Sequence, residues 1–336
     1  MVAYLYESLE NNQVKCNLCS HRCMIKDGHR GICGVRENQQ GVLKALTYGN
    51  LIARHIDPIE KKPLFHFLPG SLSYSIATVG CNFRCRFCQN ADIAQMPADH
   101  KGMIMGDLCT PSEVVAAAER SGCRSISYTY TEPTIFFEFA YETAKLASER
   151  GIRNVFVTNG YMTAEALEMI QPYLDAANVD LKAFTEKYYK ELCGARLKPV
   201  QDTLKLMKSL RIFVEVTTLI VPGLNDDPKE LKDLAIFIAQ ELGAEIPWHI
   251  SRFHPTYKLT DRPSTPVETL TKARKIGLKA GLKYVYTGNV PGNAAENTFC
   301  YGCGETVIER RGFQVGKLRI KDSHCAKCGA LIEGVW

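Results

Sequence analysis

The stretch Cys81-Asn-Phe-Arg-Cys85-Arg-Phe-Cys88-Gln-Asn follows the apolar run Ser75-Ile-Ala-Thr-Val79 after a single glycine. The apolar run predicts a buried strand, so the three cysteines stand in the loop at its carboxyl end. Three thiols with the spacing C-x₃-C-x₂-C can bind three irons of a [4Fe–4S] cluster. A cluster that only carries electrons is normally held by four cysteines, so this spacing predicts an iron without a protein ligand. The alternatives are a zinc site or a chance clustering of cysteines.

The composition is typical of an ordinary soluble protein. The 336 residues are 46% hydrophobic and 23% charged, with a formal net charge of +5. The chain has no apolar run of 18 residues or more and does not begin like a secretion signal, so we expect a cytoplasmic protein without a membrane partner. Lys and Arg are interspersed with acidic residues, and we therefore expect no nucleic-acid partner.

Most of the 14 cysteines fall into three groups of four, three and four. In a cytoplasmic chain such groups are metal ligands rather than disulfides. We call Cys81, Cys85 and Cys88 the open group, because a fourth cysteine is missing. The N-terminal group is Cys16, Cys19, Cys23 and Cys33, and the C-terminal group is Cys300, Cys303, Cys325 and Cys328.

Each four-cysteine group can close a metal site. The N-terminal group can bind zinc or an auxiliary iron–sulfur cluster, with His21 and His29 as spare ligands. We favour zinc there, since a short segment low in apolar residues is the usual setting of structural zinc. The C-terminal group consists of two C-x₂-C-Gly knuckles about twenty residues apart, which predicts a structural zinc ribbon.

Between the two closed groups, strand and helix patterns alternate. Strands are expected at 73–79, 125–130, 154–157, 177–181, 213–220, 248–251 and 283–286. Helices are expected at 111–120, 134–150, 164–173, 200–209, 228–241 and 266–280. This alternation predicts an α/β fold with a partial or nearly closed parallel β/α barrel, whose working residues lie at the carboxyl ends of the strands. We expect a Cys-rich N-terminal extension with a metal site at 1–72, the barrel at 73–289 and a zinc-ribbon-like domain at 290–336.

The open group, with the aromatic Phe87 before its last cysteine, resembles the signature of the radical S-adenosylmethionine (radical SAM) superfamily. The chain is most similar to the glycyl-radical-enzyme activases and to the radical SAM enzyme of the AmmeMemoRadiSam system. The resemblance covers nearly the whole chain and is densest between residues 73 and 289. It implies an open-iron [4Fe–4S] cluster that, after reduction by an external donor of the ferredoxin or flavodoxin type, cleaves S-adenosylmethionine (SAM) to a 5′-deoxyadenosyl radical. That radical removes hydrogen from a substrate C–H bond.

The resemblance also assigns residues at the strand ends to SAM. Glu132 stands where the family's Gly-Gly-Glu-Pro holds the methionyl amine, although Tyr130 and Thr131 replace the two glycines. Asp180 and Lys182 match the activase residues for the ribose hydroxyls and the methionyl carboxylate. An acid at a helix N-terminus and an ordinary ion pair are the alternative interpretations. The further SAM-binding candidates are Phe87, Asn159, Ile250 and His254.

Other residues have two open interpretations. Lys62 and His66 lie in a proline-interrupted loop, and either approach the site or belong to the surface. Cys109, Cys123 and Cys193 are expected to be packed thiols, and Cys193 is the one to test for a catalytic role.

The chain departs from the activases at the Gly-Gly pair and by lacking an arginine near Thr217. Together with the two extra cysteine groups, this favours direct modification of a small molecule or peptide over glycyl-radical activation of a partner protein. Memo-like and AMMECR-type proteins of the related system are candidate partners. The alternatives from other classes are a zinc-ribbon module that binds nucleic acid or protein, and an electron-transfer protein with four-cysteine clusters.

Overall fold

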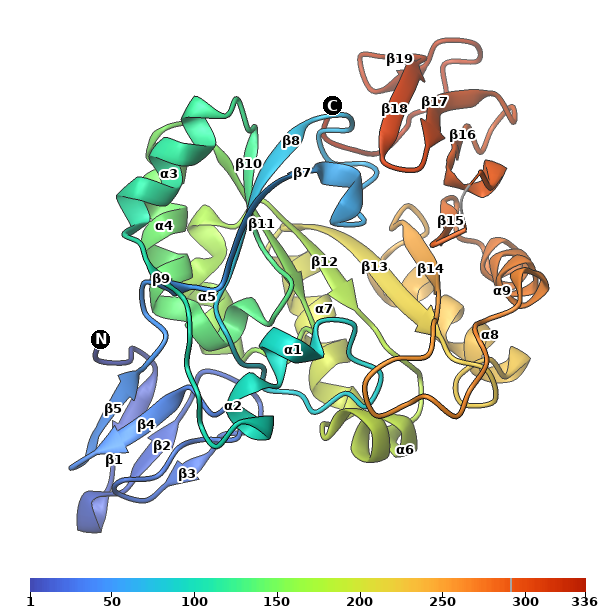
Figure 1. Cartoon of the computed structure of the whole chain (residues 1–336). Helices are drawn as coiled ribbons and strands as arrows, with labels where there is room; N and C mark the ends of the chain where they lie inside the picture. Colours follow the sequence, from blue (N-terminus) through green and yellow to red (C-terminus); the bar gives the residue numbers. More distant parts are fainter. Residues whose placement is uncertain (291) are drawn as a thin grey trace.

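The computed structural model describes residues 1–290 and 292–336. Its centre is one eight-stranded sheet with the order β15-β14-β13-β12-β11-β10-β8-β7 (Figure 1). Seven strands are parallel: β8 (Leu72–Ala77), β10 (Ser125–Tyr128), β11 (Arg153–Thr158), β12 (Ala176–Asp180), β13 (Phe213–Ile220), β14 (Trp248–Arg252) and β15 (Val285–Gly288). In the described residues β15 and β7 do not pair with each other, so the sheet is a partial barrel that is not closed.

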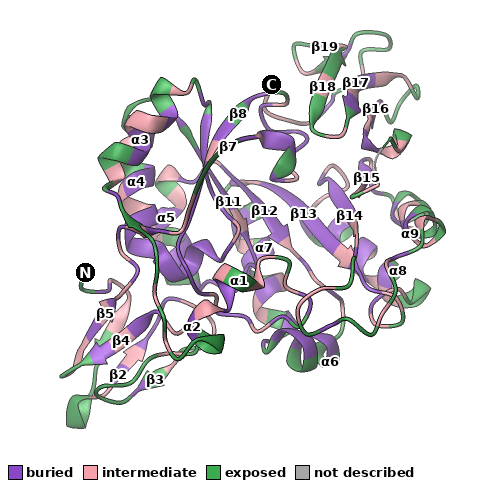
Figure 2. Ribbon diagram, viewed as in Figure 1, coloured by how far each residue is buried: buried purple, intermediate pink, exposed green. Residues whose placement is uncertain are grey.

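Helices follow the parallel strands and cover the outer side of the sheet (Figure 1). They are α3 (Pro111–Arg120), α4 (Phe137–Glu149), α5 (Ala164–Ile170), α7 (Leu197–Ser209), α8 (Pro228–Phe237) and α9 (Val267–Lys279). Figure 2 shows that the sheet is largely buried, while exposed residues lie on the outward faces of the helices. None of the helices in the described ranges is long and apolar enough to cross a membrane.

The expected elements are found, with shifted ends. The bounds 111–120 and 213–220 agree with α3 and β13. The side chain of Thr110 caps α3, and the Thr110 backbone N–H donates to the Glu113 side chain. This capping box joins residues close in sequence, so the sequence can predict it. The expected helix 134–150 is divided into η3 (Pro133–Phe136) and α4, because Phe136 leaves the helical conformation with φ −111° and ψ 37°.

Three other helical segments contain a 3₁₀-helical or π-helical turn. The helix expected at 164–173 ends as η4 (Gln171–Tyr173), and that expected at 228–241 ends in a π-helical turn, η6 (Ile238–Leu242). A second π-helical turn, η5 (Tyr189–Cys193), follows α6 (Glu186–Tyr188). Two short helices, α1 (Ala91–Ala94) and α2 (Met96–Asp99), follow the open cysteine group.

The N-terminal part consists of small sheets. These are β1 (Tyr6–Ser8), β2 (Val14–Cys16) and β3 (Met24–Ile25), the hairpin β4 (Arg36–Gln39) with β5 (Val42–Ala45), and β6 (Asn50–Leu51) paired with β9 (Asp107–Leu108). The next strand, β7 (Ala53–Pro58), pairs antiparallel with β8 and forms an edge of the main sheet. The boundary expected at residue 72 therefore separates two paired strands, because the contact that joins them is not local in sequence.

The C-terminal part contains a three-stranded sheet and a hairpin. The sheet is β16 (Thr298–Phe299), β17 (Thr306–Arg311) and β18 (Gln314–Leu318), and the hairpin is β19 (Ile320–Lys321) with β20 (His324–Cys325). The end of the chain returns to the barrel, where the Val335 N–H donates to the His66 carbonyl at 2.7 Å.

His66 is part of this junction and not of a surface loop. It is fully buried, its Nε2 lies 2.6 Å from the Tyr286 hydroxyl, and its Nδ1 lies 2.6 Å from the Glu333 carbonyl. Burial lowers the pKa of His66 to about 4, so the imidazole is neutral at neutral pH. His66 therefore joins the barrel to the C-terminal segment, whereas Lys62 reaches the cavity described next.

Candidate active site

A cavity of about 1290 Å³ lies at the carboxyl ends of the parallel strands. Strands β10 to β15 each contribute side chains to its wall at or just beyond their ends, as expected for a β/α barrel. The open group, Cys81, Cys85 and Cys88, lines the same cavity. The structure thus brings the cysteine loop and the strand ends to one place.

The cysteine loop is held by its neighbours on both sides. The backbone N–H groups of Arg84 and Arg86 donate to carbonyls of the π-helical turn η5, at 2.8 and 3.0 Å. The Asn159 amide donates to the Asn82 side chain at 2.7 Å and lies 3.9 Å from Cys81 Sγ. Phe87 is buried against Tyr188. Asn159 and Phe87, both expected near SAM, therefore also position the loop.

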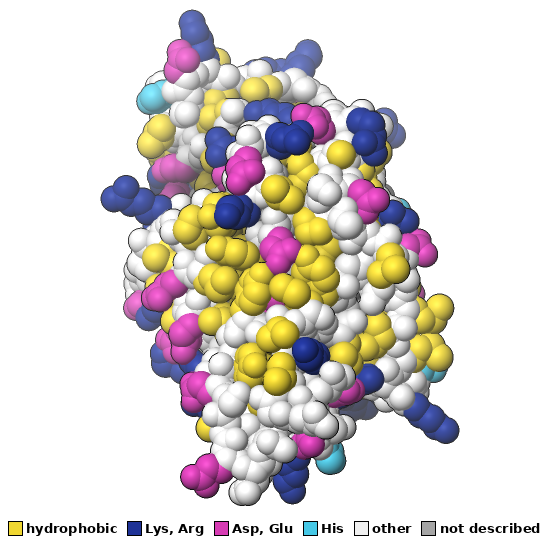
Figure 3. All heavy atoms as spheres, turned by 90° about the vertical axis from the view of Figure 1, so that its left-hand side faces the viewer, with side chains coloured by type: hydrophobic (Ala, Val, Ile, Leu, Met, Phe, Trp, Pro, Cys, Tyr) yellow, Lys and Arg dark blue, Asp and Glu magenta, His cyan; other side chains and the backbone are white. Residues whose placement is uncertain are grey.

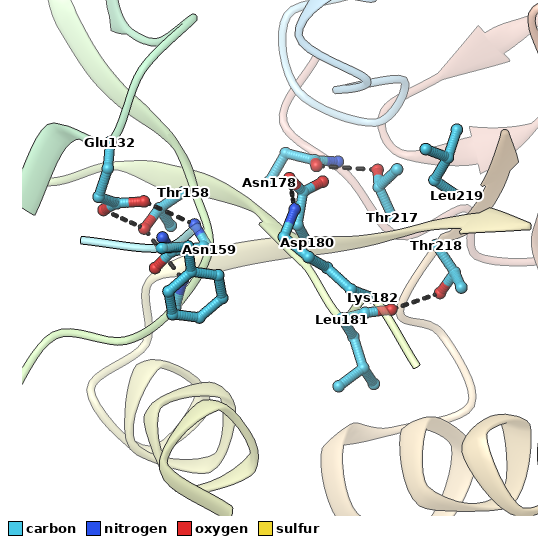
Figure 4. Close-up of polar contacts among 12 residues, drawn as sticks. Glu132, Thr158, Asn159, Asn178, Asp180, Leu181, Lys182, Thr217, Thr218 and Leu219 are labelled. Carbon is cyan, nitrogen blue, oxygen red and sulfur yellow. Dashed lines mark hydrogen bonds and ion pairs between the residues drawn. The ribbon is translucent and has the colours of Figure 1, made fainter. Parts of the chain in front are cut away.

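Glu132 joins the ends of two strands at the cavity wall. Its Oε1 accepts from the backbone and hydroxyl of Thr134 and from the Thr158 hydroxyl, and its Oε2 accepts from the Asn159 N–H at 2.8 Å (Figure 4). Burial raises the pKa of Glu132, while these donors oppose the shift. The contact with Thr134 is the expected cap of a helix N-terminus. Since Oε2 accepts a single bond in the described residues, it can still accept an ammonium group.

Tyr130, which the resemblance places at a glycine position, has a glycine-like backbone. Its φ of 63° lies in the left-handed region, which costs an L-residue roughly 1–2 kcal/mol. Its hydroxyl donates to Asp57, and its ring lies 4.5 Å from the Lys62 ammonium, which Asp57 binds at 2.6 Å. Burial lowers the pKa of Lys62 to about 8, although Asp57 opposes this shift. The replacement of glycine therefore preserves the turn and adds a buried polar contact.

We expect the variant Tyr130→Gly to unfold at a higher urea concentration than Tyr130→Ala. Both variants lose the ring and the hydroxyl, so they differ in the backbone preference at φ 63°. Alanine is disfavoured there by about 1 kcal/mol relative to glycine. Circular dichroism during an anaerobic urea titration measures the difference. Equal midpoints, or a more stable alanine variant, would show that this position is not strained.

Asp180, the last residue of β12, and Lys182, just beyond it, form an ion pair with 2.9 Å between Asp180 Oδ2 and Lys182 Nζ (Figure 4). Both line the cavity. Burial disfavours the charge on Lys182, but Asp180 and the nearby thiols hold its pKa well above the ordinary value. The Asn225 side chain fixes the backbone here by donating to the Lys182 carbonyl at 2.7 Å. The ion pair is therefore a feature of the cavity wall, with Asp180 Oδ1 left for a further donor.

The side chains of β14 do not point in the predicted directions. Ile250, expected to pack on adenine, is fully buried in the hydrophobic core and is not part of the cavity wall. Because side chains alternate along a strand, its neighbours His249 and Ser251 face the cavity instead. His249 is held by Glu215, with 2.6 Å between Nε2 and Oε2. His254 lies at the mouth, exposed, 3.0 Å from the Ser264 hydroxyl.

The C-terminal cysteines converge as ligands of a single metal ion do. In the described part of the chain, one group of Cys, His or acidic residues has all its ligand atoms within 4.8 Å of one another: Cys300, Cys303, Cys325 and Cys328. The Cys300–Cys328 and Cys303–Cys325 sulfur distances are 3.6 and 3.9 Å. Tetrahedral zinc with bonds of about 2.3 Å places its sulfurs about 3.8 Å apart. The backbone N–H of Cys328 lowers the pKa of Cys325 to about 7, which favours the thiolate.

The chain is similar in sequence and in fold to known radical SAM proteins. Residues 75–237 match the Radical SAM superfamily. The chain is 49% identical to an uncharacterized protein of Methanocaldococcus jannaschii over 98% of both chains. It is 26% identical to the pyruvate formate-lyase-activating enzyme of Clostridium pasteurianum, over 61% of this chain and 87% of that protein. The solved structure of a radical SAM methyltransferase from Sphaerobacter thermophilus is similar with a TM-score of 0.52 at 15% identity, over 70% of each chain.

Through residues 75–237, the chain belongs to the radical SAM superfamily. The open group of this radical SAM protein fits a [4Fe–4S] cluster. Unlike the C-terminal cysteines, Cys81, Cys85 and Cys88 do not converge within 4.8 Å in the described structure, and a cluster spreads its thiolates over separate irons. Burial raises the pKa of Cys81, and the contact with Cys193 and burial raise that of Cys85. A cationic iron core offsets this cost of forming thiolates.

Two residues in the wall of this radical SAM cavity were given no role by the sequence analysis. Arg252, the last residue of β14, forms no ion pair with any described residue, although its Nε donates to the Thr265 carbonyl at 2.8 Å. Thr287 on β15 is buried, and its hydroxyl has no partner in the described chain. Arg252 has the strand parity of Ile250, which faces the core, so parity alone does not place Arg252 at the cavity. The unpartnered hydroxyl of Thr287 became visible through tertiary structure alone.

Proposed function

We propose that the chain is a radical SAM enzyme that removes a hydrogen atom from a C–H bond of a small molecule or peptide. The observation that carries this proposal is the cavity of about 1290 Å³ with the open cysteine group in its wall. Pockets for one small ligand are about 300–1,000 Å³. The cavity therefore has room for SAM and for part of a substrate.

The residues of the strand ends supply binding and orientation. A reduced [4Fe–4S] cluster on the open group supplies the electron that cleaves SAM to methionine and the 5′-deoxyadenosyl radical. Glu132 accepts the methionyl ammonium, and Asp180 accepts the ribose hydroxyls through its free oxygen. Arg252 is the unpaired cation for the methionyl carboxylate in place of the arginine missing near Thr217. Lys182 is already paired with Asp180 and orients the carboxylate group of Asp180.

The C-terminal domain contributes a wall on the substrate side. Arg311, Gly312 and Phe313, at the turn between β17 and β18, line the cavity together with Glu296. Both Arg311 and Phe313 are exposed and therefore available to a ligand. A wall made by a separate small domain restricts the mouth, and this favours a small molecule or a flexible peptide.

The second candidate is a glycyl-radical activase of a partner protein. It is favoured by the similarity to proteins named as activating enzymes, including a putative glycyl-radical enzyme activating enzyme of Methanocaldococcus jannaschii at 23% identity. In either case an external donor of the ferredoxin or flavodoxin type supplies the electron, and Memo-like and AMMECR-type proteins are candidate partners. On the face in Figure 3, Lys and Arg alternate with Asp and Glu, which offers no support for a nucleic-acid partner.

One anaerobic experiment tests the proposed chemistry. The protein is reconstituted with iron and sulfide, reduced with dithionite and mixed with SAM, and the products are separated by liquid chromatography. We expect methionine and 5′-deoxyadenosine in equal amounts. Absence of 5′-deoxyadenosine from a protein that contains its iron would overturn the proposal.

The C-terminal group is proposed to bind zinc and to hold the wall formed by residues 311–313. We expect Cys325→Ala to lower bound zinc from about one per chain to near zero, because a structural zinc site needs all four ligands. The ribbon should then be cut readily by protease, while SAM cleavage persists because its residues lie on the main sheet. Cys123→Ala, another buried thiol, is the matched control. Unchanged zinc in Cys325→Ala would contradict the assignment.

A further inference from the structure

The N-terminal cysteines surround a small enclosed cavity of their own. Cys16, Cys19, Cys23 and Cys33 line it, and its apolar wall includes Ile135 of the barrel. The cavity volume is about 10 Å³. A cavity of about 10–15 Å³ can hold one water molecule. In a zinc site the four thiolates lie about 2.3 Å from the metal and are too close together to leave a water-sized void between them. The void among these four cysteines therefore indicates a wider arrangement than a zinc site.

The sulfur separation in the N-terminal group can be compared with that in the other two cysteine groups of the chain. The C-terminal sulfurs converge within 4.8 Å, as the ligands of one tetrahedral ion do. The sulfurs of the open group, which belongs to the radical SAM cluster, do not converge in this way in the described structure. The N-terminal sulfurs behave like the open group, since they too are outside the set that converges within 4.8 Å among the described residues. These sulfurs are therefore farther apart than the four ligands of one tetrahedral zinc ion.

A buried arginine supports an anionic group in this cavity. Arg36 is 1% exposed and lines the cavity together with the cysteines. Its two terminal nitrogens bind the carboxylate of Glu138 at 2.8 and 2.9 Å. Its Nε has no hydrogen-bond partner in the described chain. An unsatisfied buried N–H is costly, and thiolate or sulfide is an acceptor that removes this cost.

His21 connects the N-terminal group to the loop of the open group. Its Nε2 lies 2.8 Å from the carbonyl oxygen of Asn82, the residue after Cys81. On the same side, a Cβ built on Gly80 would lie 3.2 Å from the Cys33 carbonyl oxygen and 2.7 Å from Val35 Cγ1. The backbone of the N-terminal group therefore packs directly on the residues that flank Cys81. The two cysteine sites share one wall.

We propose that Cys16, Cys19, Cys23 and Cys33 hold a second [4Fe–4S] cluster, with four protein ligands, beside the cluster of the open group. This replaces zinc as the favoured occupant of the N-terminal site. The proposal rests on the proposed function only in that the open group supplies the neighbouring cluster. A site with four thiolates has no iron left for SAM, so it is an electron-transfer site and not a second catalytic site.

The decisive experiment removes the open group and leaves the N-terminal group intact. The variant Cys81→Ala/Cys85→Ala/Cys88→Ala is reconstituted anaerobically with iron and sulfide, and its iron, sulfide and zinc are measured. We expect about four irons and four sulfides per chain, compared with about eight of each in the wild type. After dithionite reduction, the variant should give the electron paramagnetic resonance signal of one reduced cluster. No iron together with about two zinc ions per chain would overturn the proposal.

A second variant tests the ligands themselves. Cys16→Ala/Cys33→Ala should retain about four irons on the open group and lose the other four. If this variant does not fold, the variant without the open group still decides the question. The wild type separates the two proposals. Formation of 5′-deoxyadenosine with about four irons and two zinc ions would refute the second cluster alone. Eight irons without this product would refute the proposed function alone.

Discussion

Replacing Cys85 with alanine should abolish the formation of 5′-deoxyadenosine from SAM. Cys85 is 7% exposed and lines the cavity together with the other two cysteines of the open group. With two thiolates left, the cluster loses the ligand of one iron, so the electron source for SAM cleavage is lost. The measurement is product formation per chain after anaerobic reconstitution and reduction with dithionite. Undiminished product in this variant would contradict the assignment of the open group.

Two matched variants make this result specific. Cys123→Ala removes a buried thiol that is not in the cavity wall, and it should keep the activity and iron of the wild type. Cys193→Ala removes the thiol that contacts Cys85. If Cys193 is a packed thiol, this variant should also keep its iron. Loss of SAM cleavage with full iron in Cys193→Ala would instead assign it a catalytic role.

Glu132→Gln should reduce SAM cleavage about 100-fold, mainly by raising the KM for SAM. The amide cannot offer a charged acceptor to the methionyl ammonium, and a hydrogen bond to a charged group contributes about 1.5–3 kcal/mol. The new NH₂ group also competes with the Asn159 N–H, since Oε2 accepts from that donor at 2.8 Å. The KM should rise while the iron content stays at the wild-type value.

Glu230→Gln is the control for this change. Glu230 is half-buried, whereas Glu132 is buried; Glu230 likewise accepts a backbone N–H, from Phe184 at 2.7 Å, but it is not part of the cavity wall. Burial raises the pKa of both carboxyl groups, so both variants remove a carboxylate that burial disfavours. Equal losses of activity would show that Glu132 acts through the stability of the fold and not through SAM.

Local patterns in the sequence were sufficient for much of the fold. The cap of α3 joins residues three positions apart, Thr110 and Glu113, and is readable without a structure. The spacing of the cysteines in the open group and the alternation of strands and helices are equally local. They were sufficient to place the catalytic loop after the first parallel strand and the candidate SAM residues at the strand ends.

The errors arose where the outcome depends on distant segments. Ile250 was expected to face SAM, but the direction of a side chain depends on how β14 pairs with β13, and this pairing turns His249 to the cavity. The strand β7 was missed because its partner β8 comes after a long loop. The contribution of Arg311 and Phe313 to the cavity wall likewise depends on how a separate domain packs on the barrel.

The sequence by itself determined which residues are candidates for the chemistry: three thiols that would leave one iron open, and the carboxylates and lysine at the strand ends. Residue type and short spacing are sufficient for that, because a ligand's chemistry belongs to its side chain. Tertiary structure alone decided how far apart the sulfurs of each group lie. Spacing along the chain is compatible with zinc or a cluster, whereas packing of the N-terminal segment against Gly80 and Ile135 sets the separation of the thiols in space.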